Sequence, residues 1–225
     1  MSEESRKIQD EKIQDDSKEI KDIRENIHCI SIIGQIEGHT SLQPEQKSTK
    51  YEEIIPKIVA IEESKDVKGL LILVNTVGGD VESGLMIASA ISGMSKPTVA
   101  LVLGGAHSIG IPIAVSANKT FIAKSASMTI HPVRMNGMVI GVHQSFEHFK
   151  KIQDRIIDFV VEHSSVSDEQ FRSLMLNTGE LVSDVGTIVN GEEAVSIGLC
   201  DEVGTLSEAL KCLHEMIDQR DDSNK

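Results

Sequence analysis

The 225-residue sequence has no excess of basic residues and no long apolar run. Its 22 Lys and Arg stand against 35 Asp and Glu, which gives a formal net charge of −13. Because phosphate backbones and anionic lipid surfaces are bound through basic surfaces, this balance disfavours a nucleic-acid partner and an electrostatic lipid anchor. No apolar run approaches the roughly 18 to 20 residues of a membrane span, so we expect no integral membrane segment.

Cysteines and nucleotide-binding motifs are also scarce. The three cysteines, Cys29, Cys200 and Cys212, have no metal-type spacing, and their odd number is typical of reduced thiols in a cytosolic protein. No secretory signal is recognisable at the start of the sequence. Neither GxGxxG nor GxxxxGK[ST] occurs, which disfavours nucleotide binding. We therefore expect a cytoplasmic protein without metal or cofactor, and peripheral attachment to a membrane complex stays open.

The composition of the remainder is that of an ordinary globular protein long enough for one large domain. Residues 1–27 form a charged arm in which KIQD occurs twice, and its thin apolar stripe predicts a segment that is disordered or ordered by a partner. We expect one folded domain over 28–217 and a polar tail over 218–225.

Alternating strands and helices are predicted within that domain. The run at 69–75 is apolar up to its last residue, Asn75, which is typical of a parallel strand covered by helices on both faces. The recurring order of strand, glycine turn and helix predicts βαβ units and a mainly parallel sheet. We expect strands at 28–35, 69–75, 98–103, 120–123 and 127–131, helices at 51–63, 81–94, 107–117 and 144–163, a helix capped by Ser167, and a short helix, a strand and a helix at the end.

Ser108 is the first candidate for chemistry. It follows the apolar run and Gly104-Gly105 and precedes Gly110, so glycines would allow a tight turn and the close approach of a substrate backbone. A hydroxyl on such a strand-to-helix turn suits a nucleophile. The pattern is GGxxSxG rather than GxSxG, and a serine that only caps the helix is the alternative.

His131 is the second candidate, at the end of a strand that Pro132 stops. The carboxyl edge of an open α/β sheet is where such proteins hold their sites, although a strand-end histidine can also be structural. His107 is a poor base for Ser108, because adjacent residues on a helix do not face each other. It would instead line the pocket or face a neighbouring subunit.

Gly78-Gly79 ends the preceding apolar strand and can present backbone N–H groups to the same crevice. The Gly79 amide, together with that of Ile109, would form an oxyanion hole. A phosphate-binding glycine loop is the alternative, which the missing nucleotide motifs disfavour.

Taken together, four segments resemble the Clp protease proteolytic subunit (ClpP) family, peptidase S14 type, and within it the translocation-enhancing (TepA-type) branch. They are LLILVNTVGGDVESG, GGAHSIG, SASMTIHP and GEEAVSIGLCDEV, within about residues 32 to 205. The resemblance implies an α/β, ClpP/crotonase-like fold: a twisted, mostly parallel sheet wrapped by helices, with a protruding handle helix. It also implies Ser108 as nucleophile, His131 as base and Asp184 as acid.

Three departures from the family pattern stand out. The connection from Asp184 to the EEAV segment is two residues longer than usual, and a gapless match would place Gly186 at the acid position. Val77 replaces the proline before Gly-Gly, and Val133-Arg134 follows His131-Pro132 where His-Gln-Pro is usual. These differences suggest altered substrate handling or regulation.

The resemblance implies a serine endopeptidase that acts inside a chamber of stacked rings, held together by the helix at 144–163. Peptides or unfolded proteins would bind as an added β-strand, and any ATP dependence would come from a separate unfoldase or export machinery. One alternative is a catalytically weak adaptor that assists protein translocation. Another is an acyl-CoA enzyme of the same superfold, which would not need the serine and histidine.

Overall fold

The computed structural model describes residues 26–134, 141–179 and 185–223. The charged arm therefore lies outside the described residues except for its last two positions. The elements in chain order are β1 (Ile27–Glu37), β2 (Ser48–Lys50), α2 (Tyr51–Glu63), β3 (Gly69–Gly79), α3 (Val81–Ser92), β4 (Thr98–Ala106), α4 (Gly110–Val115), β5 (Lys119–Ile122), β6 (Ser127–Ile130), α5 (Val142–Glu162), α6 (Asp168–Met175), β7 (Thr187–Asn190), α7 (Gly191–Ser196), β8 (Glu202–Val203) and α8 (Leu206–Ser223).

The strands form a sheet in the order β2-β1-β3-β4-β5-β8, and all of these neighbours are parallel. β6 branches from this path: it pairs in parallel with β4 at Gly105 and antiparallel with β7. The predicted mostly parallel α/β sheet is therefore confirmed. Strands β2 and β7 were not predicted, because each is short and lacks a long apolar run.

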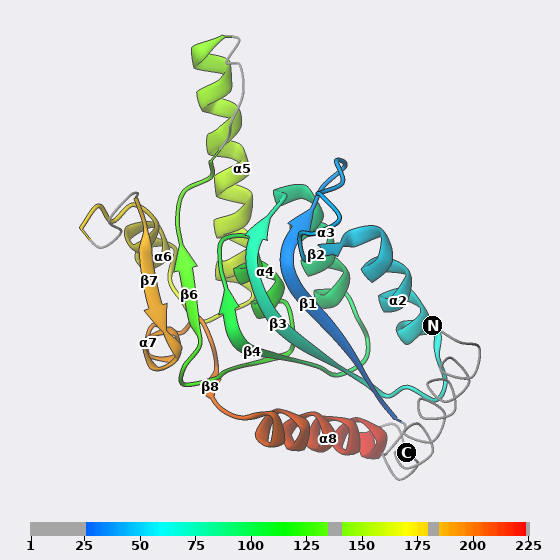
Figure 1. Ribbon diagram of the computed structural model, residues 1–225. Helices are drawn as coiled ribbons and strands as arrows, with labels where there is room; N and C mark the ends of the chain where they lie inside the picture. Colours follow the sequence, from blue (N-terminus) through cyan, green and yellow to red (C-terminus); the bar gives the residue numbers. More distant parts are fainter. Residues whose placement is uncertain (1–25, 135–140, 180–184, 224–225) are drawn as a thin grey trace, which may run out of the picture.

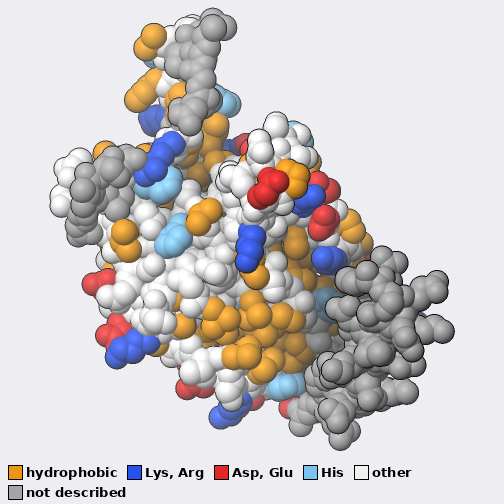
Figure 2. All heavy atoms as spheres, in the orientation of Figure 1, with side chains coloured by type: hydrophobic (Ala, Val, Ile, Leu, Met, Phe, Trp, Pro, Cys, Tyr) orange, Lys and Arg blue, Asp and Glu red, His pale blue; other side chains and the backbone are white. Residues whose placement is uncertain are grey.

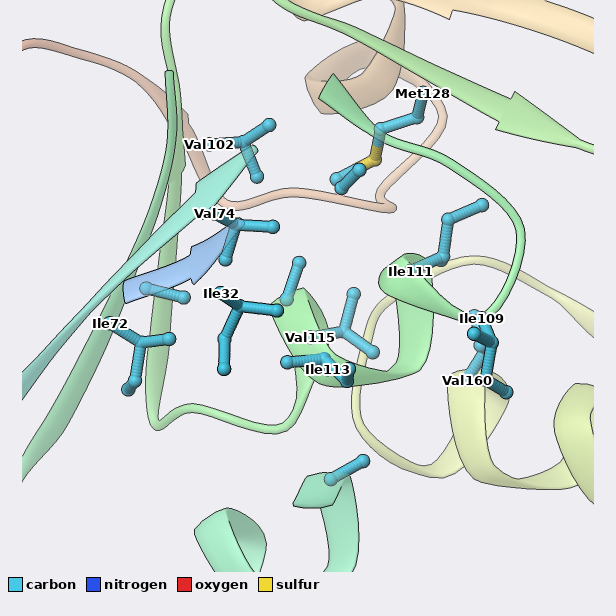
Figure 3. Close-up of a cluster of buried hydrophobic side chains, with 14 of the residues drawn as sticks. Ile32, Ile72, Val74, Val102, Ile109, Ile111, Ile113, Val115, Met128 and Val160 are labelled. Carbon is cyan, nitrogen blue, oxygen red and sulfur yellow. The ribbon is translucent and has the colours of Figure 1, made fainter. Parts of the chain in front are cut away.

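The sheet is covered on both faces, as the apolar strands predicted. Leu70, Ile72 and Val74 of β3 belong to the main core, whereas Leu71 belongs to a second cluster with residues of α8. Figure 1 shows α8 lying along one side of the sheet and α2, α3 and α4 on the other. In the main core, side chains from the strands point toward those of α4, including Ile113 and Val115 (Figure 3).

The glycine pairs are not turns, contrary to the prediction. Gly78-Gly79 are the last residues of β3, and Gly104-Gly105 lie inside β4, because pairing continues through Ile36 to Gly79 and through Thr76 to Ala106. The helix predicted from 107 begins at Gly110 instead. Its start is delayed because Ser108 has a φ of 56°, which no right-handed helix allows.

Helix α5 projects from the body of the molecule, as the predicted handle helix should (Figure 1). Within its 21 residues only Ile157 and Val160 are buried. The terminal helix α8 continues to Ser223, past the predicted start of the polar tail. Within the described ranges, no helix is long and apolar enough to cross a membrane.

Candidate active site

One small pocket brings together four of the five residues predicted for the site. Its volume is about 130 Å³, and Gly79, Ser108, Ile109 and His131 line it. Gly79 ends β3, whereas Ser108 and His131 follow the ends of β4 and β6, so the pocket lies at the carboxyl edge of the sheet. The other lining residues, mostly apolar, are Val81, Ile111, Ile130, Pro132, Val133, Arg134, Ile156, Phe171 and Met175.

Ser108 is held in an unusual backbone conformation. Among the described residues it is the one non-glycine with a positive φ, a left-handed geometry that costs an L-residue about 1 to 2 kcal/mol. Surrounding hydrogen bonds hold it there: Ser108 N donates to Thr129 O at 2.9 Å, and His107 N donates to Thr76 O at 3.1 Å. Strain of this kind is concentrated at functional sites.

The alternative that Ser108 merely caps a helix is wrong. The residue at the N-cap of α4 is Ile109, and no side chain caps this helix. The structure also shows why a glycine lies beside the serine in space. A Cβ on Gly78, whose φ is 87°, would lie 2.7 Å from both Ser108 Cβ and His107 O. Gly78 therefore lets β3 approach the serine closely.

The backbone amides around the serine differ in availability. Ser108 N bonds Thr129 O, Gly110 N bonds His107 O, and Gly78 N bonds Thr76 Oγ1 at 3.0 Å. Within the described chain, Ile109 N donates to no backbone carbonyl. The buried Ile109 side chain packs on Gly84 of α3, where an added Cβ would overlap it. The Ile109 amide is thus rigidly placed and free to bind an oxyanion.

His131 presents one nitrogen to a backbone carbonyl. Its Nδ1 lies 2.7 Å from the oxygen of Pro132, and a carbonyl can only accept, so Nδ1 carries the proton. The other nitrogen, Nε2, is then unprotonated in the neutral ring and can act as a base. Within the described chain, no hydrogen bond joins Ser108 Oγ to His131. The predicted acid, Asp184, lies outside the described residues.

His107 does not act as the base for Ser108, as expected. The reason differs from the expected one, because the helix begins only at Gly110, after both residues. Its Nδ1 lies 2.8 Å from the hydroxyl oxygen of Thr129. Burial lowers the pKa of His107, and the nearby His131 lowers it further, which favours the neutral ring. Thr129 thus fixes both His107 and the Ser108 backbone, a role the sequence analysis missed. The sequence offered one indication of this role: Thr129 lies two residues before His131, which places both side chains on the same face of the strand.

Two arginines tie α5 to the helices on either side of the pocket. Arg155 donates to both carboxylate oxygens of Glu82 in α3, at 2.6 and 3.0 Å. Arg172 in α6 bonds Asp154 of α5 at 2.8 Å. The hydrogen bond from Arg155 lowers the pKa of Glu82. These ion pairs set α5 against the pocket, to which it contributes Ile156. Among the residues described, no cluster of His, Cys, Asp or Glu could hold a metal ion.

Comparison with known proteins finds relatives that are Clp proteases or named for protein translocation. The chain is 57% identical over 195 residues to the translocation-enhancing protein TepA of Halalkalibacterium halodurans. The aligned region covers 87% of this chain and 76% of that protein. It is 27% identical over 157 residues to the ATP-dependent Clp protease proteolytic subunit 1 of Protochlamydia amoebophila, covering 67% and 72%.

A solved structure, that of a ClpP1 mutant from Listeria monocytogenes, shares the fold. The TM-score is 0.65 at 20% identity, over 86% of this chain and 98% of that one. The profile of the Clp protease family matches residues 23–207, which include every element from β1 to β8. This chain therefore belongs to the Clp protease family, as the four sequence segments indicated.

Proposed function

We propose that the protein is a serine endopeptidase in which Ser108 is the nucleophile and His131 the general base. The observation that carries the proposal is the left-handed backbone of Ser108, which delivers its hydroxyl to the pocket that His131 also lines. A serine that only packs or caps has no need of this strained geometry. Both residues line one pocket at the edge of the sheet where open α/β folds bind ligands.

The chemical steps follow from these positions. Ser108 Oγ attacks the peptide carbonyl while Nε2 of His131 takes the hydroxyl proton and later gives it to the leaving amine. The amides of Ile109 and Gly79 stabilise the negative charge on the tetrahedral oxygen, and the loss of one such donor costs about 10² to 10³ in rate. From the sequence, the third position is assigned to Asp184.

The pocket suits one apolar side chain of an extended peptide. Its volume of about 130 Å³ is below the roughly 300 to 1,000 Å³ of small-molecule sites. This size argues against a coenzyme thioester as substrate and so against the acyl-CoA alternative. A peptide bound as an added β-strand would gain affinity from its main chain and have little sequence selectivity.

Self-association would cover apolar surface that the single chain leaves open. Val77 and Leu103 lie on the sheet face that α8 covers only in part, and Val77 is 65% exposed. Figure 2 shows hydrophobic side chains gathered over the neighbouring part of the sheet, next to α8. On the projecting α5, Phe146 is 64% exposed. We infer assembly into rings that enclose the sites, in the cytoplasm, with a separate unfoldase or export complex supplying substrates.

A catalytically weak adaptor in protein translocation is the second candidate. It is favoured by the name of the 57% identical relative. The described chain also has no hydrogen bond between Ser108 and His131. Hydrogen bonds of this kind can be long in unliganded serine enzymes and shorten with substrate, so the geometry by itself does not favour the adaptor over the peptidase.

A fluorophosphonate probe read by intact mass separates the two functions. The assembled wild-type protein should gain one adduct per chain, and Ser108→Ala and His131→Ala should gain none. Lack of an adduct on a correctly assembled wild type would reject the peptidase and favour the adaptor. Light scattering on the same sample tests the ring, because a stable monomer contradicts it.

A further inference from the structure

One hydrogen bond, at Nδ1, orients the ring of His131. Nδ1 of His131 faces the carbonyl oxygen of Pro132 at 2.7 Å, which is a normal hydrogen-bond length. Pro132 belongs to the residues that line the pocket, and its ring restricts the φ angle to about −65°. One of the two backbone angles that place this carbonyl is therefore fixed.

Among the described residues, backbone occupies the space directly beside His131. Gly186 lies against the histidine, and a Cβ there would overlap Ile130 O and lie 2.9 Å from His131 Cβ. Its φ of 138° also disfavours any other residue. Gly186 N donates to Asn177 O at 2.7 Å, which fixes this segment. The position that a gapless family match gives to the acid thus has neither a side chain nor room for one.

We propose that the Pro132 carbonyl is the positioning group of the catalytic histidine and takes the place of a carboxylate at Nδ1. This proposal rests on the proposed peptidase function and changes only the third member of the catalytic triad, which the sequence assigned to Asp184. A carboxylate on Nδ1 selects the tautomer and stabilises the imidazolium. A carbonyl accepts the same proton, so it selects the same tautomer, but as a neutral dipole it stabilises the cation less.

The proton balance of the reaction is unchanged. As Ser108 Oγ bonds to the substrate carbon, its proton moves to Nε2 of His131, and the Nδ1 proton stays on the ring and donates to Pro132 O throughout. The Nε2 proton then passes to the departing amine nitrogen as the C–N bond breaks. We infer a serine–histidine pair with a backbone acceptor, which is slower than a full triad and does not depend on a carboxylate.

Nitrogen-15 NMR of histidine-labelled full-length protein tests the tautomer without relying on activity. The neutral His131 ring should show a protonated Nδ1 and an unprotonated Nε2, in the wild type and equally in Asp184→Asn, with His131→Gln used to assign the signals. A spectrum in which Asp184→Asn loses or reverses the tautomer would overturn the proposal. This outcome can be read even if the serine never reacts, so it is independent of the failure of the peptidase function.

Labelling rates give the second measurement. Pro132→Gly releases the φ angle and should slow fluorophosphonate labelling about tenfold or more, because small displacements of catalytic groups have effects of this size. Pro44→Gly, in an exposed loop, is the matched control and should label at the wild-type rate. Asp184→Asn should slow labelling by at most about tenfold, whereas loss of a tautomer-setting carboxylate costs about 10⁴. A loss of that larger size in Asp184→Asn, or wild-type rates in Pro132→Gly, would refute the positioning role.

Discussion

The strained backbone of Ser108 predicts an unusual order of stability among inactive variants. Ser108→Ala and Ser108→Gly both remove the hydroxyl, which has no hydrogen bond to any described residue. The two variants therefore differ chiefly in how well each residue tolerates a φ of 56°. We expect the glycine variant to be the more stable one, contrary to the usual rule that glycine weakens a fold.

The size of the difference follows from two opposing terms. The left-handed conformation costs alanine about 1 to 2 kcal/mol and glycine almost nothing. Glycine in turn loses about 0.5 to 1 kcal/mol more conformational freedom on folding than alanine. The balance favours Ser108→Gly by about 1 kcal/mol, which corresponds to about 2 to 4 °C in Tm for a chain of this length.

Urea unfolding followed by circular dichroism measures this difference. Both variants must be compared at one protein concentration, because self-association raises apparent stability. Ser89, exposed in the last turn of helix α3, is the matched control site. There the order should reverse, with alanine about 1 kcal/mol more stable than glycine. If alanine is also more stable than glycine at position 108, the left-handed geometry assigned to the serine is wrong.

Three further predictions concern the surroundings of the site. Gly78→Ala should lower the free energy of unfolding by about 2 to 4 kcal/mol and abolish fluorophosphonate labelling, because its Cβ would meet backbone and the serine at 2.7 Å. Gly179→Ala, whose Cβ would make an ordinary contact at 3.5 Å, should change stability by less than about 0.5 kcal/mol. Glu82→Gln should cost at most about 1 kcal/mol at pH 7, since the pair with Arg155 is half exposed. Because Arg155 lowers the pKa of Glu82, this contribution should vanish as acidification protonates the carboxylate, and a constant difference in urea midpoint down to about pH 3 would contradict it. Burial lowers the pKa of His107 in the folded chain, so below about pH 6.5, its ordinary pKa, the unfolded chain binds the proton more readily than the folded one. Wild-type stability should therefore fall from pH 7 to about pH 5, and His107→Asn should flatten that fall.

Much of the fold could be predicted because its signals are local. The first part of the strand, Gly69 to Val74, is apolar on both faces, so its burial between helix layers followed from the residue pattern alone. The N-cap of α6 at Ser167 was likewise predictable, and its side chain accepts from Gln170 N. Glycine was misleading: Gly104-Gly105 reads as a turn, yet pairing with neighbouring strands keeps it extended.

The sequence by itself determined which residues could do chemistry. Ser108, His131, Gly79 and Ile109 were found from residue type, spacing and family resemblance, and all four line the pocket. Residue types and their local order are properties of the chain, so no long-range contact was needed to recognise them.

Only the tertiary structure decided which atoms hold these residues in place. Thr129 reaches Ser108 and His107 because β6 crosses to lie beside β4, a contact between segments 22 residues apart. The Pro132 carbonyl acts through a backbone atom that every residue type possesses, and no sequence pattern can single it out. The strain at Ser108 has the same origin, since a left-handed serine persists only where bonds from distant strands fix its backbone.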